Sequence, residues 1–265
     1  MNLDYIKQKD FKEWYKKLDG DNGLCLTDDL DSLASCKVLN KIFGIDIFGF
    51  FSFDTYYLSE NRTVEKLVGV DLDLAKHKAF SNHVTYIQNP EIISLNKGIN
   101  RSNYYDKFAG STLITVLSLY NVNLDKLSSK QLQLLLAVDS GYLQYNFNRD
   151  LFEYYYKDVL QYPQFIDIAK DTSKKEFERL QRIYNLKCKI QINQEGYLNT
   201  YIKLDELGDI FNIDLSLPKE QFIPIQQYQN AGFNYYELQR KNITDNIIFS
   251  SAITNKDYIK LSLRV

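Results

Sequence analysis

The sequence predicts an α/β protein whose sheet is mostly parallel and carries helices on both faces. Short apolar runs alternate with segments that place apolar residues at helical spacing, which is typical of strands joined by helical crossovers. The strand-like runs are almost continuously apolar, as expected where both faces of a sheet are covered. The chain has 265 residues, of which 45% are hydrophobic and 25% charged, so it is long enough for one large or two smaller globular domains.

The first half shows this alternation most clearly. An amphipathic helix is expected over 1–20, followed by a turn at "GDNG" and a buried strand in "LCLTD". Apolar periodicity predicts a helix over 30–44 that ends at Gly44. Further strands are expected over 45–53, 66–73 and 79–87, and further helices over 103–121 and 127–141.

The second half is organised differently. Charged helical segments over 149–160 and 173–186 indicate a connector, and four strand-like runs follow at 188–194, 221–228, 246–253 and 258–265. The sequence therefore predicts a catalytic-type unit over 1–146, a helical connector over 147–186, and a smaller α/β domain over 187–265.

Composition limits the class of protein. A net charge of −2 argues against a broad basic face for long nucleic acid, and three scattered cysteines without a CxxC pair favour a reducing compartment. The most apolar stretch, "IFGIDIFGFFSF", is interrupted by Asp46 and is too short to span a bilayer. The N-terminus does not resemble a signal peptide, so a cytoplasmic protein without a membrane partner is expected; the oligomeric state stays open.

Acidic side chains gather where the predicted strands end. Asp28, Asp29 and Asp31 follow "GLCL", and Asp71 and Asp73 lie at the end of "LVGV". His83 comes after the short run "AF", and Asp139 closes the apolar run "LQLLLAV". Ligands of open α/β sheets bind beyond the carboxyl ends of the strands, so these side chains are expected at one edge.

Clustered carboxylates repel one another unless a cation neutralises them, and hard divalent ions prefer oxygen ligands. Adding one imidazole to such a set suits Mn²⁺. Each residue also has a purely structural interpretation, since Asp28 resembles a helix cap, Asp139 a turn residue and His83 a satisfied core histidine. The metal hypothesis depends on the whole set.

The order of these motifs resembles the DHH phosphoesterase superfamily over residues 22–146. Its first motif, Asp-x-Asp-x-x-x-Ser, matches Asp29 to Ser35, its second matches Asp71 in "LVGVD", and its fourth matches Asp139 in "LLLAVDSGYLQYN". "QNPEIISLN" and "YYDKFAGST" are similar to segments of RecJ-like members.

The resemblance implies a phosphoesterase that uses Mn²⁺ or Mg²⁺, with two ions, to hydrolyse phosphodiester bonds of short single-stranded nucleic acid or small nucleotides. Asp71 is the expected bridge between the ions. The implied catalytic and metal-binding residues are Asp29, Asp31, Asp71, His83 and Asp139, with Asn82 as a further metal ligand. The implied substrate-binding residues are Lys97, Arg101, Lys107 and Ser111.

The chain departs from the family at its third motif, where Asn82 and Val84 replace the Asp and the second His. An inactive DHH-like module that binds nucleotides is therefore an alternative. "LVGVDLDLA" also resembles the opening motif of haloacid-dehalogenase-like phosphatases, although Ala75 departs from that pattern. The final "YIKLSLRV" resembles a strand of the DHH-associated substrate domain, but the Gly-rich loop of that domain is missing.

Overall fold

The computed structural model describes residues 1–60, 66–241 and 243–265. A ten-stranded sheet runs through it in the order β6-β11-β12-β10-β3-β2-β1-β4-β5-β7. Five neighbouring strands form a parallel half: β2 (Ile47–Phe51), β1 (Asn22–Leu26), β4 (Lys66–Val70), β5 (Ala79–Phe80) and β7 (Ile92–Ile93). This half contains the strands expected around "LCLTD" and "KLVGVDLD".

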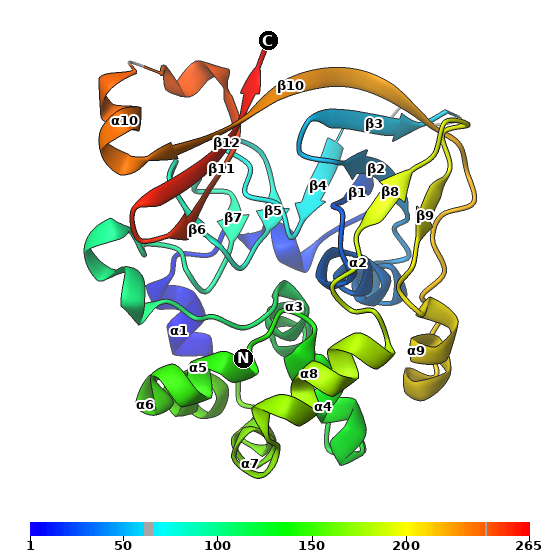
Figure 1. The fold of residues 1–265 in the computed structure, drawn as a ribbon, viewed down its shortest axis with the longest axis vertical. Helices are drawn as coiled ribbons and strands as arrows, with labels where there is room; N and C mark the ends of the chain where they lie inside the picture. The colour runs from blue at the N-terminus through cyan, green and yellow to red at the C-terminus, as the bar shows by residue number, and fades with distance from the viewer. Residues whose placement is uncertain (61–65, 242) are drawn as a thin grey trace.

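Every pairing of this sheet outside the parallel half is antiparallel, so the expectation of a mostly parallel sheet is wrong. The antiparallel strands are β3 (Thr55–Ser59), β10 (Phe222–Asn234), β12 (Tyr258–Arg264), β11 (Ile248–Asn255) and β6 (Val84–Thr85). The long strand β10 pairs with β3 through its first part and with β12 through its second, arching over the molecule in Figure 1. Tight hairpin turns, such as the one between β11 and β12, impose antiparallel pairing.

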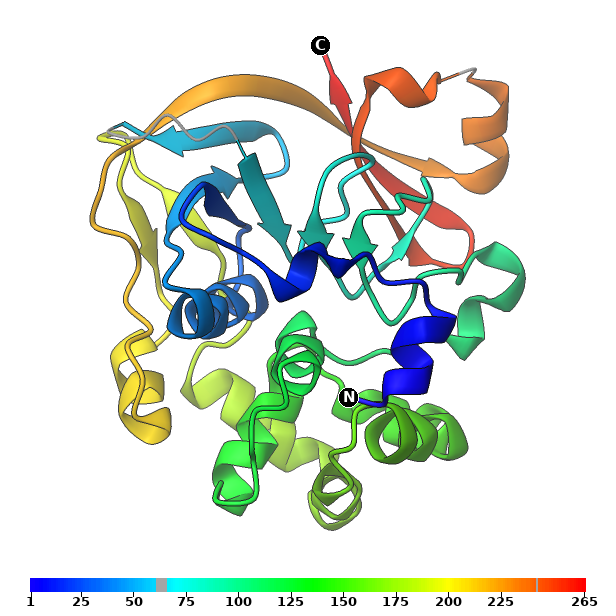
Figure 2. The ribbon, with the colours of Figure 1, turned by 180° about the vertical axis from the view of Figure 1, so that it is seen from behind.

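The helices pack mainly on one side of the sheet, as Figures 1 and 2 show. They are α2 (Leu30–Phe43), α3 (Thr112–Leu119), α4 (Ser129–Ala137), α5 (Tyr142–Phe147), α6 (Arg149–Glu153), the π-helical turn η3 (Tyr154–Val159), α7 (Gln164–Asp171), α8 (Lys174–Ile183) and α9 (Leu204–Phe211). Helix α2 ends as expected at Gly44, which adopts a left-handed conformation with φ 68°. The expected helix over 103–121 is instead a 3-10 turn, η2 (Arg101–Asp106), followed by α3.

Helices do not cover both faces of the parallel half, which corrects the second part of the fold prediction. The connections from β4 to β5 and from β5 to β7 contain no helix, because both are shorter than the roughly dozen residues that a helical crossover requires. The uncovered face packs instead against Leu72, Leu74 and Phe249. The antiparallel half thus takes the place of the missing helices.

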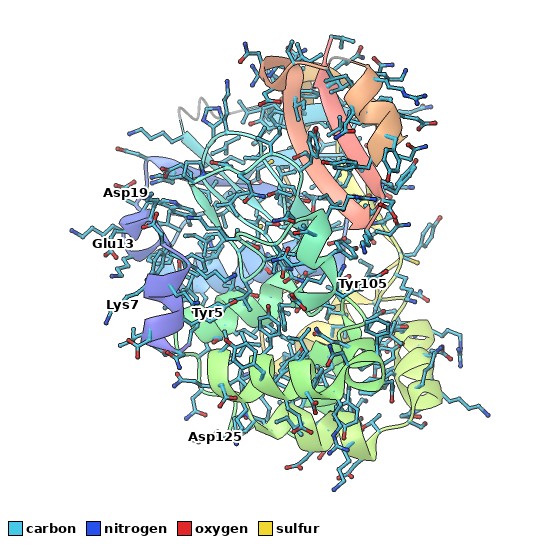
Figure 3. All side chains as sticks on the ribbon, turned by 90° about the vertical axis from the view of Figure 1, so that its left-hand side faces the viewer. Tyr5, Lys7, Glu13, Asp19, Tyr105 and Asp125 are labelled. Carbon is cyan, nitrogen blue, oxygen red and sulfur yellow. The ribbon has the colours of Figure 1, made fainter. Side chains whose placement is uncertain are left out.

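The N-terminal segment is built into the core rather than lying on it as one amphipathic helix. Helix α1 (Leu3–Gln8) and the 3-10 turn η1 (Glu13–Lys16) are separated at Asp10, whose φ is 48°. Figure 3 shows Lys7 and Glu13 at the surface, whereas Tyr5 is buried and its hydroxyl donates to the Leu95 carbonyl at 3.1 Å.

Residues 187–265 are joined to residues 1–146 both through the sheet and through the hydrophobic core. The hairpin of β8 (Ile190–Ile192) and β9 (Leu198–Thr200) meets the start of α2, where the Ile190 N–H donates to the Asp28 carbonyl at 2.6 Å. Helix α10 (Tyr235–Arg240) packs beside β10.

The domain division over 1–146, 147–186 and 187–265 stays a prediction. Among the described residues, no helix has the length and apolar character needed to cross a membrane.

Candidate active site

Two acids after β1 connect the starts of two helices. Asp29 caps α2, where its Oδ1 accepts the Ser32 N–H at 3.2 Å. Asp31 is 4% exposed, and its carboxylate accepts the backbone N–H groups of Thr112 at 2.8 Å and Leu113 at 2.7 Å, at the start of α3. The partial positive charge at these helix N-termini stabilises negative side chains there.

Asp71 follows β4 and lies beside the same helix start. Its Oδ1 accepts the Thr112 hydroxyl at 2.7 Å, so Thr112 binds both Asp31 and Asp71. The backbone of Asp71 is left-handed, with φ 55°, which is strained for a residue with a side chain. Such strain is retained where the surrounding structure requires one placement of the side chain.

His83 contacts Asp73, an acid that the sequence placed at this edge of the sheet but not among the implied catalytic and metal-binding residues. Its Nδ1 lies 3.0 Å from Asp73 Oδ2, an ion-pair distance, although the alignment is not that of a hydrogen bond. The Ser81 hydroxyl donates to Asp73 and accepts the His83 N–H. The negative charge of Asp73 raises the pKa of His83 well above its usual range, which favours the protonated imidazole. The His83 side chain is 42% exposed and is therefore accessible from solvent.

Asp139 reaches the cluster from the turn after α4, because two glycines permit a close approach. A Cβ atom on Gly141 would lie 3.2 Å from the Gly110 Cα and 3.1 Å from the Tyr156 hydroxyl. Gly110 directly precedes Ser111, which caps α3 by accepting the Ile114 N–H at 3.1 Å. The turn that carries Asp139 thus packs against the residues that directly precede α3, at Gly110.

The acids of the cluster perturb one another electrostatically. Burial raises the pKa of Asp31 well above its usual range, and the negative charges of Asp71, Asp139 and Asp29 raise it further. Burial likewise raises the pKa of Asp71 to about 7, and the positive charge of His83 limits this increase. Partial desolvation and the charge of Asp29 also raise the pKa of Asp139, a residue that is exposed at the surface. Hydrogen bonds to Thr112 thus link Asp31 and Asp71, and Asp29, His83 and Asp139 lie near enough to act on their charges.

The donor set has the chemistry of a site for a hard divalent ion. Carboxylate oxygens and one imidazole suit Mn²⁺ or Mg²⁺, and the side-chain oxygen of Asn82 is buried without a hydrogen-bond partner. As the side chains stand, however, no three His, Cys, Asp or Glu residues of the described ranges form a metal-holding group. The oxygens of Asp31 are occupied by N–H donors instead.

The four residues expected to bind the substrate phosphate occupy different surroundings. Lys97 donates to the Asp10 carbonyl at 2.7 Å, and Arg101 pairs with Asp257 at 2.6 Å. Lys107 donates to the Tyr104 hydroxyl at 2.8 Å, and its charge lowers the pKa of Asp139. Ser111 is the buried cap of α3. Lys107 is therefore the member of this set that acts on the cluster, and the substrate roles stay predictions.

Sequence reasoning missed Lys189, a cation contributed by the last segment. Its Nζ lies 2.8 Å from Asp28 Oδ1 and 3.3 Å from Asp29 Oδ2. These partners are 161 and 160 positions away along the chain, and no local pattern connects them. Asp73 carried a weak signal, since it follows Asp71 at the alternating spacing of a strand end.

Comparisons with known proteins do not identify this site, so its chemistry is inferred from its own residues and contacts. No family model, no curated protein and no solved structure matches this chain.

Proposed function

We propose that the protein is a metal-dependent phosphoesterase that hydrolyses phosphodiester bonds of short single-stranded oligonucleotides or small nucleotides. The observation that carries the proposal is that Asp31 and Asp71, at the ends of two neighbouring parallel strands, share Thr112 at the start of α3. The charges of Asp29, His83 and Asp139 act on this pair. The proposal is also supported by the placement of Asp29 and Asp31 after β1 and of Asp71 after the neighbouring parallel strand β4.

A structural role alone does not explain this arrangement. Buried carboxylates whose pKa values are raised by burial and by one another lower the stability of the ion-free fold near neutral pH. Proteins retain such unfavourable groups chiefly where a ligand or a reaction needs them. Bound divalent ions would remove the repulsion, polarise a phosphate and lower the pKa of a water nucleophile.

The residues proposed to hold the ions are Asp29, Asp31, Asp71, His83 and Asp139, with Asn82 as a further ligand. In the ion-free protein, the protonated His83 supplies positive charge beside Asp71 and Asp139. Lys107 and Lys189 carry positive charge beside Asp139 and Asp29 and are the proposed contacts of the substrate phosphate. Lys107 and Lys189 together favour a small, anionic substrate.

The test combines metal binding with turnover. Mn²⁺ titration calorimetry and hydrolysis of a panel comprising a short oligonucleotide, a dinucleotide, a cyclic dinucleotide and pyrophosphate are compared for wild type, Asp31→Asn and Asp71→Asn. We expect hydrolysis of an oligonucleotide or dinucleotide by wild type, and a loss of at least about 100-fold in both variants. Asp125→Asn, at an exposed surface position in Figure 3, is the matched control. Full activity in Asp71→Asn contradicts the proposal.

The second candidate is a DHH-like module that binds nucleotides without turnover. It is favoured by the replacement of the family's second histidine by Val84, which is buried and pairs with Ile253 of β11. In the same assays, this module would bind Mn²⁺ and nucleotide while every substrate stays intact.

A further inference from the structure

A pocket opens on the face of the parallel half that lacks helices. Its volume is about 510 Å³, within the usual range of small-molecule sites. Cys25, Leu67 and Gly69 form its sheet surface. These residues alternate along β1 and β4 with Leu24, Leu26, Val68 and Val70, which belong to the core on the helical side. The pocket and α2 therefore lie on opposite faces of the sheet.

The curled antiparallel half makes one wall of this pocket. Tyr228 of β10 and Phe249 of β11 stack with ring centroids 4.3 Å apart, and Tyr56 of β3 lines the same space. The Ala75 N–H donates to the Phe249 carbonyl at 2.8 Å, which holds β11 against the loop after β4. Regular strands thus position the aromatic wall.

The rim of the pocket is positively charged. Lys66, His77 and Lys78 line it together with a single acid, Glu91. No ion pair joins any of the three basic residues to a carboxylate within the described ranges. The rim therefore retains cationic groups for a ligand.

The loop that carries His77 and Lys78 has a defined, strained conformation. His77 is left-handed, with φ 76°, and its carbonyl accepts the Asn89 side-chain amide at 2.7 Å. The same amide donates to the Leu74 carbonyl at 2.9 Å. The buried Asn89 thus fixes both ends of the segment that presents His77, at a small cost in backbone energy.

We propose that this pocket binds a planar aromatic anion, with its ring on the aromatic and aliphatic surface and its anionic group at Lys66 and Lys78. Flat rings pack well against aromatic side chains, and lysine ammonium groups attract phosphate or carboxylate. One acid is too few for a divalent cation, and the size of the pocket fits a molecule such as a nucleoside monophosphate. The proposal is independent of any chemistry at the acidic cluster.

Trp14, the single tryptophan, provides a direct readout because Lys78 Nζ lies 5.5 Å from the centre of its ring. The full chain, without divalent metal, is titrated with AMP, nicotinate, adenosine and inorganic phosphate, by tryptophan fluorescence and by calorimetry. We expect AMP or nicotinate to bind with a Kd below about 1 mM, and adenosine and phosphate to bind at least about tenfold more weakly. The two anions distinguish a phosphate ligand from a carboxylate ligand.

Matched variants assign the binding to this pocket. Tyr228→Ala is expected to weaken it about tenfold or more, whereas Tyr228→Phe retains the ring and the affinity. Lys78→Gln is expected to weaken it about fivefold, and Lys76→Gln, an exposed neighbour outside the pocket, to leave it unchanged. Asp71→Asn in the acidic cluster also leaves it unchanged.

Two results overturn the proposal. One is the absence of binding by both anions at concentrations up to about 10 mM. The other is binding that is lost in Asp71→Asn and unaffected by Lys78→Gln, which assigns the ligand to the acidic cluster. If Tyr228→Ala fails to fold, as shown by circular dichroism, the surface substitution Lys78→Gln decides the question.

Discussion

The carboxylate of Asp31 and the backbone N–H of Thr112 are joined by a hydrogen bond of 2.8 Å across 81 positions of the chain. The hydroxyl of the same threonine donates to Asp71 at 2.7 Å. The start of α3 therefore holds the acids after β1 and β4 together. Four predictions about this site follow from its contacts.

Replacing Thr112 by valine is expected to loosen the site without changing its shape. The variant loses the hydroxyl bond to Asp71 but keeps the backbone N–H that binds Asp31. We expect a loss of about 1–2 kcal/mol in the free energy of unfolding, measured by urea denaturation. The pKa of Asp71 should rise further, because its charged form loses a donor. Thr112→Ser, which keeps the hydroxyl, should resemble wild type; equal losses in both variants would contradict the assignment.

The stability of the ion-free protein should fall as pH rises through neutrality. The folded-state pKa of Asp71, about 7, lies above that of an unfolded chain, so the protonated acid favours the fold at low pH. Its stabilising contribution is lost as pH increases from about 4 to about 8. Asp71→Asn should remove part of this slope and gain on the order of 1–4 kcal/mol at pH 8, measured by denaturation across pH. If Asp71→Asn showed the same change in the free energy of unfolding with pH as wild type, the raised pKa of Asp71 would be contradicted.

Adding a side chain at Gly141 should disturb the position of Asp139. A Cβ atom there would meet the Tyr156 hydroxyl at 3.1 Å and the Gly110 backbone at 3.2 Å. We expect Gly141→Ala to cost about 1–3 kcal/mol in thermal or urea unfolding and to weaken Mn²⁺ binding. Gly20→Ala is the control, since no atom lies within 4 Å of the added Cβ. Equal behaviour of the two variants would show that the approach of Gly141 to Gly110 is unimportant.

Removing the charge of Lys189 should affect ion binding more than stability. Its ion pairs with Asp28 and Asp29 are half-exposed, so Lys189→Gln should change the free energy of unfolding by less than about 1 kcal/mol. Because the ammonium group competes with a divalent ion for these acids, the variant should bind Mn²⁺ several-fold more tightly by calorimetry. Lys187→Gln, a nearby exposed lysine outside these pairs, is the control. Weaker Mn²⁺ binding in Lys189→Gln alone would contradict the competition.

Local chemistry made several elements predictable. Helix α2 begins after an aspartate that caps it and ends at a left-handed glycine, and both signals lie within the segment they delimit. The gathering of Asp31 and Asp71 was also predictable, because the ends of parallel strands share one edge of a sheet. The N-terminal segment was predicted less well: its helix breaks at the left-handed Asp10, between the buried Tyr5 and Phe11.

The amino-acid pattern by itself established elements with local signals, such as strands β1 and β4 and helix α2, and the position of acids at strand ends, because these depend on neighbouring residues. Tertiary structure alone decided that β10 pairs with both β3 and β12, that the second face of the parallel half stays free of helices, and that Lys189 contacts Asp28. Pairing partners far apart in the chain are selected by the packing of the whole core, and no local periodicity encodes that choice.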